Sequence, residues 1–144
     1  IGVLAEIALF ALAGKFKERI GPLTLLTAAA LAGVIRWLLL AMLENHVALF
    51  VTQILHCFTF GAAHLGAMTF LSKTIPKDVF ATGQGIYYTL VGGVFSGCML
   101  PVAGFLFTSM AGNAFYFMAI LSAFALGGLY LLSRCSYQHL ENEH

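Results

Sequence analysis

Several residues with ionisable or strongly polar side chains lie inside long apolar stretches of the sequence, and five of them define the chemistry that the chain could perform. They are Glu6, Arg36, Gln53, His56 and His64. A guanidinium stays protonated and binds a carboxylate through two parallel N–H groups, whereas a carboxyl or an imidazole can take up and release a proton. The set is therefore suited to binding a small anion and to exchanging protons in an apolar environment.

The same residues do not predict catalysis. An enzyme site inside a membrane needs a nucleophile with a base, or a set of metal ligands. His56 and His64 have no acidic partner facing them on their own predicted helix, and no HExxH-like spacing occurs. We therefore predict that the protein is not an enzyme and holds no metal and no cofactor.

The amino-acid composition predicts that lipid surrounds the elements that position these residues. Of the 144 residues, 60% are hydrophobic and 9% are charged, and the mean hydropathy is +0.93. An ordinary soluble domain has about 25% charged residues. The net charge of +1 creates no field that would attract nucleic acid. We expect an all-α integral membrane protein whose main partner is the lipid bilayer.

Five apolar stretches are candidates for transmembrane helices. They cover about residues 1–14, 22–43, 47–72, 79–107 and 113–133, and a cytoplasmic tail of residues 134–144 follows. A helix needs about 20 residues to cross a bilayer, so the last four stretches are long enough and the first is short. The sequence also begins with Ile1, inside an apolar run. We therefore expect that the native chain starts upstream of Ile1.

The positions of Lys and Arg indicate how these spans are oriented. Residues 15–19 and 73–77 hold four Lys and one Arg, and Arg134 follows the last span. The connections at residues 44–46 and 108–112 hold neither Lys nor Arg. Cytoplasmic loops retain these basic residues. We therefore expect the first connection, the third connection and the C-terminus in the cytoplasm, with the spans in a bacterial inner membrane.

The first connection carries a motif in which two glycines flank an acid and a base. Gly14 and Gly21 surround Glu18 and Arg19. Glycines let two helices approach and turn within a few residues, and the acid and base can pair with each other or with helix ends. The loop resembles the signature loop of the major facilitator superfamily, which follows the second helix and recurs after the eighth. The basic residues that usually follow the second glycine are absent, and Pro22 stands there instead.

The resemblance to the major facilitator superfamily implies a secondary transporter. Because an inward-running helix enters the motif loop and four more spans follow, the chain corresponds to helices 8 to 12 of a twelve-helix member. It would then form most of one six-helix half, and its partner would be an N-terminal half of about seven helices in the same chain. The motif loop, with Gly14, Glu18, Arg19 and Gly21, would act as a cytoplasmic gate between two conformations.

Several stretches are similar to the phenylpropionate-permease branch of that superfamily, namely residues 1–6, 34–37 and 53–57. This resemblance implies uptake of a small aromatic carboxylate together with protons. Symporters that resemble lactose permease carry an acid on helix 8, an arginine on helix 9, and on helix 10 a histidine with an acid three residues later. Glu6, Arg36 and His56 match the first three positions. Thr59 stands at the fourth, so the proton would have to be carried by Glu6 or by a group outside this chain.

The predicted depths of these side chains place them in one band of the membrane. At 1.5 Å per residue, Gln53 and Arg36 lie about 9 and 10 Å below the outer surface of the apolar core, His56 about 14 Å and Glu6 about 18 Å. At about 100° per residue, Gln53, His56 and His64 can share one helix face. Substrate sites of transporters usually lie near the midplane.

Packing is the competing interpretation for each residue. Arg36 could extend to the outer interface, and polar side chains often only join helices. For Gln53, His64 and Tyr87 we favour packing, although the Tyr87 ring could stack on an aromatic substrate. Two alternatives to the carboxylate symporter stay open. One is a small stand-alone membrane protein with a structural or assembly role, and the other is a major-facilitator transporter for efflux, sugars or nucleosides.

Overall fold

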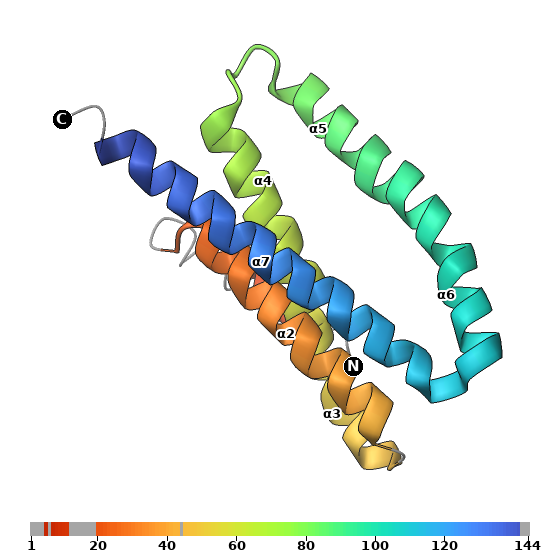
Figure 1. Ribbon diagram of the computed structural model, residues 1–144. Helices are drawn as coiled ribbons and strands as arrows, with labels where there is room; N and C mark the ends of the chain where they lie inside the picture. Colours follow the sequence, from red (N-terminus) through yellow and green to blue (C-terminus); the bar gives the residue numbers. More distant parts are fainter. Residues whose placement is uncertain (1–4, 6, 12–19, 44, 142–144) are drawn as a thin grey trace.

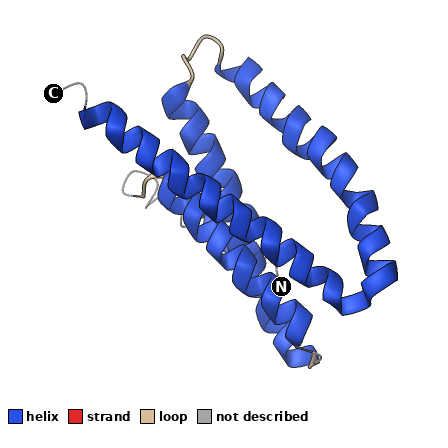
Figure 2. Ribbon diagram, in the orientation of Figure 1, coloured by secondary structure: helices blue, strands red, loops and turns tan. Residues whose placement is uncertain are grey.

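The computed structural model describes residues 5, 7–11, 20–43 and 45–141 of the chain. In this part, helices and short connections make up the whole structure, with no strand (Figure 2). The chain therefore has the all-α membrane fold that its composition predicts. Of the expected span at residues 1–14, the described residues Ala5 and 7–11 are α-helical.

Helix α2 (Pro22–Met42) is the central element of the packed bundle. It begins with a proline in its first turn, where a missing backbone N–H costs nothing. Its 21 residues give a length of about 31 Å, which matches the apolar core of a bilayer. It ends where the N–H of Leu43 donates to the carbonyl of Leu39, at 2.9 Å. The small residues Ala29, Ala32 and Gly33 are buried on it.

A second long helix packs against α2 and contains an irregular turn. It consists of α3 (His46–His56), the π-helical segment η1 (Cys57–Ala62) and α4 (Ala63–Thr74). It ends at Ile75, which adopts an extended conformation because Pro76 disfavours a helical residue before it.

The next helix stands apart from the others over much of its length (Figure 1). It runs through α5 (Phe80–Tyr88), the π-helical segment η2 (Thr89–Phe95) and α6 (Ser96–Met110). The chain then reverses at the 3-10 turn η3 (Ala111–Asn113), where Ala111 has a positive φ of 49°. The large apolar side chains of α6 are widely exposed, with Phe105 at 71%.

Helix α7 (Ala114–Glu141) returns along α2 and completes the bundle. The two helices approach closely at Gly33. A Cβ atom added at this position would lie only 2.9 Å from Ser122 Oγ of α7. Helices α4 and α2 approach equally closely at Gly66. A Cβ atom added at Gly66 would lie 2.9 Å from Cγ of Leu26. Small residues at such crossings are typical of helices packed inside a membrane.

Three stretches of the described chain are long enough and apolar enough to cross a membrane: Pro22–Met42, Thr52–Thr74 and Phe80–Arg134. The third stretch folds back on itself at η3, so it contains two antiparallel helices. The four resulting helices coincide with the last four predicted spans, within a few residues at most ends. The difference is at the C-terminus, where α7 continues to Glu141 although the predicted span stops at residue 133. A helix forms its backbone hydrogen bonds internally, so it need not end with the apolar stretch.

Candidate functional site

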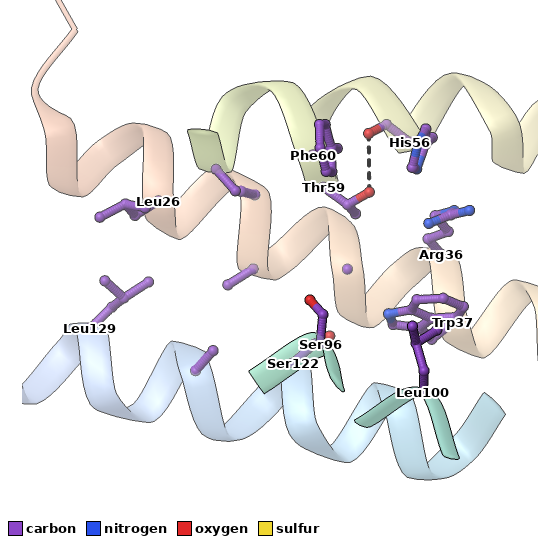
Figure 3. A pocket seen from close by; sticks show the side chains of 15 residues that line it. Leu26, Arg36, Trp37, His56, Thr59, Phe60, Ser96, Leu100, Ser122 and Leu129 are labelled. Carbon is purple, nitrogen blue, oxygen red and sulfur yellow. Dashed lines mark hydrogen bonds between the residues drawn. The ribbon is translucent and has the colours of Figure 1, made fainter. Parts of the chain in front are cut away.

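A cavity of about 870 Å³ lies between α2, the π-helical segment η1 and helices α6 and α7. Its walls are mainly apolar. The polar side chains that line it are Arg36, His56, Thr59, Ser96 and Ser122 (Figure 3). Sites for small molecules typically have volumes of about 300 to 1,000 Å³ and mainly apolar walls with a few polar groups. The volume and the lining of this cavity agree with both properties.

Arg36 lies in this cavity on a platform of aromatic rings. Its guanidinium carbon is 4.8 Å from the centroid of the Trp37 ring, and that ring stacks on Phe115 of α7 with centroids 5.9 Å apart. The Nε atom of Arg36 is buried and has no hydrogen-bond partner among the described residues. Arg36 as a whole is half-buried. A guanidinium inside a membrane keeps its charge and normally binds an anion, so Arg36 brings an incompletely satisfied cation to the cavity wall.

His56 faces the same cavity from the end of α3 (Figure 3). Its ring stacks on Phe60 with centroids 5.8 Å apart and an angle of 24° between the planes. Its Nδ1 atom is buried and, within the described part of the chain, has no hydrogen-bond partner. The structure thus brings together two of the sequence-predicted residues, Arg36 and His56, each with an unsatisfied nitrogen.

The π-helical segment separates His64 from His56. The prediction that Gln53, His56 and His64 share one face assumed a uniform α-helix, but η1 inserts six residues of wider turns between the two histidines. Gln53 is half-buried on α3 and does not line the cavity. His64 lies instead against α5, with its Nε2 atom 3.5 Å from the hydroxyl of Tyr88. In the described structure, therefore, His56 lines the cavity, Gln53 does not, and His64 contacts α5.

His64 and Tyr88 belong to the contact between α4 and α5. The Tyr87 ring meets Tyr88 edge-on, with centroids 5.5 Å apart, and neither tyrosine lines the cavity. Met68 accepts hydrogen bonds from Gln84 and Tyr88, at 3.4 and 4.0 Å. These contacts join α5 to α4. The packing interpretation of His64 and Tyr87 stays a prediction.

Four sequence-predicted residues lie outside the described residues: Glu6, Gly14, Glu18 and Arg19. Their roles stay predictions. Gly21 is described, and it precedes α2 with the extended backbone angles φ −64° and ψ 151°. No group of three or more His, Cys, Asp or Glu side chains that could hold a metal ion occurs in the described ranges.

The sequence analysis missed several residues of the cavity, above all Trp37, Ser96 and Ser122. For Trp37 a signal existed, because it is the only tryptophan of the chain and follows Arg36 directly. The two serines gave no signal. A serine in an apolar run usually bonds to its own helix, so only the neighbouring helices reveal that it lines a cavity.

Residues 1–125 match the MFS_1 like family, and the chain belongs to this family of membrane transport proteins. Within the family, it is similar to the probable 3-phenylpropionic acid transporter of Escherichia coli (strain K12). The two are 33% identical over 122 residues, which are 85% of this chain and 32% of that protein. The chain thus spans about a third of the length of the relative. No solved structure matches the chain. The predicted membership of the major facilitator superfamily, in its phenylpropionate branch, is confirmed.

Proposed function

We propose that the protein takes part in proton-coupled transport of a small aromatic carboxylate, and that Arg36 binds the carboxylate. The observation that carries this proposal is the buried Nε atom of Arg36, which has no partner in the described part of the chain and belongs to a side chain that lines a cavity of about 870 Å³. An ionised side chain inside a membrane costs at least about 2.5 kcal/mol. A bound carboxylate would compensate this cost through two parallel hydrogen bonds.

The walls of the cavity support an aromatic substrate. Trp37, Phe60 and Leu100 line it together with alanines. Aromatic rings favour stacked or edge-on neighbours, and these side chains offer both an apolar surface and ring faces. The name of the 33% identical relative points to the same chemical class, an aryl group on a short carboxylic acid.

His56 is the proposed site of proton exchange among the described residues. An imidazole can change its charge near neutral pH, and the His56 ring lines the same cavity as the Arg36 guanidinium. A proton on His56 would add positive charge beside the carboxylate and so strengthen its binding. By thermodynamic linkage, the bound carboxylate would strengthen the binding of the proton equally.

Uptake by membrane vesicles tests this proposal. With an inward proton gradient, we expect accumulation of labelled 3-phenylpropionate and no accumulation of its neutral amide, because the amide offers no anion to Arg36. Dissipating the gradient should remove the accumulation. Equal uptake of acid and amide, or uptake that does not depend on the gradient, would contradict the proposal.

The arrangement of the helices supports the predicted orientation in the membrane. The connection between α4 and α5 lies toward the end of the bundle where α7 ends, and the turn between α6 and α7 lies toward the opposite end (Figure 1). We propose that the first of these ends is cytoplasmic, since Lys77 belongs to the connection, Lys73 to the last turn of α4 and Arg134 to the C-terminal part of α7.

Cysteine labelling tests the orientation in a variant without its native cysteines. An impermeant thiol reagent should label Gly112→Cys in intact cells and Lys77→Cys only after permeabilisation. Gly112 suits the test because a Cβ atom there meets nothing within 4 Å, and Lys77 is exposed. Labelling of Lys77→Cys in intact cells would reverse the orientation.

A further inference from the structure

Three hydroxyl groups from three different helical segments line the cavity that holds Arg36. They belong to Thr59 of η1, Ser96 of α6 and Ser122 of α7 (Figure 3). Binding of a carboxylate by Arg36 does not explain these hydroxyls. A carboxylate accepts hydrogen bonds, so it needs hydrogen-bond donors and not further acceptor oxygens.

Each of the three hydroxyls donates its hydrogen to its own helix. Thr59 Oγ1 donates to the carbonyl of His56 at 3.1 Å, Ser96 Oγ to that of Val91 at 2.8 Å, and Ser122 Oγ to that of Met118 at 3.1 Å. A hydroxyl has one hydrogen and two acceptor lone pairs. With the hydrogen engaged, each oxygen can offer the cavity only acceptor sites.

The acceptors are displaced along α2 from the guanidinium. Ser122 Oγ and Thr59 Cγ2 both flank Gly33, at 2.9 and 3.8 Å from the position that a Cβ would take there. Gly33 precedes Arg36 by three residues, which is about 4.5 Å along the helix axis. An arginine has only donors. The cavity therefore presents donors and positive charge at Arg36, and acceptor oxygens that include Ser122 Oγ beside Gly33, three residues earlier on α2.

The cavity is long enough to separate two polar groups of one ligand. Its lining extends along α2 from Leu26 to Trp37. The 11 steps from Leu26 to Trp37 span about 16 Å along the helix axis. Ala29 and Ala30 line the cavity on the side of Gly33 away from Arg36, and Phe60 and Leu100 line it from η1 and α6. These apolar side chains would contact an aryl ring in the cavity.

We propose that the preferred substrate is a hydroxyaryl carboxylate, whose ring hydroxyl donates a hydrogen bond to Thr59, Ser96 or Ser122 while its carboxylate lies on Arg36. The proposal rests on the proposed function and adds a second polar subsite to it. A ring hydroxyl is a donor that can reach acceptors on the far side of the ring from the carboxylate. An unsubstituted phenyl ring would leave the three oxygens without this partner.

Competition for uptake of labelled 3-phenylpropionate tests the subsite. The competitors are its para-hydroxy, meta-hydroxy and para-fluoro derivatives, since fluorine resembles a hydroxyl in size but donates no hydrogen bond. We expect at least one hydroxy derivative to inhibit about 2-fold to 10-fold more strongly than the fluoro derivative, as one net hydrogen bond implies. Equal inhibition constants for all three would overturn the proposal.

Variants then assign the hydroxyl preference to the cavity. In a variant combining Thr59→Val, Ser96→Ala and Ser122→Ala, the ratio of the fluoro to the hydroxy inhibition constant should fall to about one. This ratio compares two ligands on the same protein, so it tolerates a lower amount of folded protein. The matched control is Ser109→Ala, because Ser109 donates to Phe105 in the same way but is exposed. A preference that survives in the combined variant would overturn the proposal.

The two proposals fail in different ways. If labelled 3-phenylpropionate is not taken up and no derivative is transported, the proposed function itself is wrong. If 3-phenylpropionate is taken up and the hydroxy derivatives show no advantage over the fluoro derivative, only the hydroxyl subsite is wrong.

Discussion

Replacing Arg36 by lysine is expected to weaken binding of 3-phenylpropionate by about 10-fold to 100-fold, although the charge is kept. A hydrogen bond to a charged group contributes about 1.5 to 3 kcal/mol, and each 1.4 kcal/mol is a factor of about ten. Lysine carries a compact ammonium that cannot form two parallel hydrogen bonds with a carboxylate. It would also lose the planar contact that holds the Arg36 guanidinium 4.8 Å from the Trp37 ring.

Arg134→Lys is the matched control for this substitution. The Arg134 guanidinium also lies over an aromatic ring, 5.4 Å from the centroid of Tyr130, but it is exposed and does not line the cavity. We expect this variant to bind as the wild type does. The neutral amide of 3-phenylpropionate should bind equally weakly to the wild type and to Arg36→Lys. If Arg36→Lys binds the acid with wild-type affinity, Arg36 does not bind the carboxylate and serves only in packing.

Replacing Gly33 by valine is expected to abolish most transport and to destabilise the protein by about 1 to 3 kcal/mol, the usual cost of overpacking a core. A Cβ at this position would lie 2.9 Å from Ser122 Oγ and 3.3 Å from Ser122 Cβ. Helices α2 and α7 would have to separate, and the new side chain would also enter the cavity that Gly33 lines. Uptake assays and thermal unfolding in detergent measure the two effects.

A second substitution distinguishes the predicted clash from a general effect of valine. Adding Ser122→Gly removes both Ser122 atoms that the new Cβ would meet, so it should restore much of the lost thermal stability of Gly33→Val. Gly128→Val on α7 is the control, because a Cβ there has no neighbour within 4 Å in the described structure. If Gly33→Val is as stable as the wild type, the close approach of α2 and α7 at this position is wrong.

The amino-acid sequence by itself determined the features that depend on local composition and length. Long apolar stretches require helices, because a backbone in lipid must form its hydrogen bonds internally. The predicted span at residues 22–43 and the helix Pro22–Met42 therefore agree closely. Arg36 could also be singled out, since it is the only Lys or Arg inside a predicted span. The family could be assigned from the motif loop between Gly14 and Gly21 and from three short stretches of the sequence.

The tertiary structure decided which side chains meet. Counting 100° per residue put His56 and His64 on one face, but His56 lines the cavity and His64 lies against Tyr88 of α5. Which helices lie beside each histidine depends on the packing of the whole bundle. The same holds for Ser96 and Ser122, which line the cavity with Thr59. Their hydroxyls gain a shared environment only when α6 and α7 come together beside α2, because contacts between residues far apart in the chain follow from the packing of whole helices.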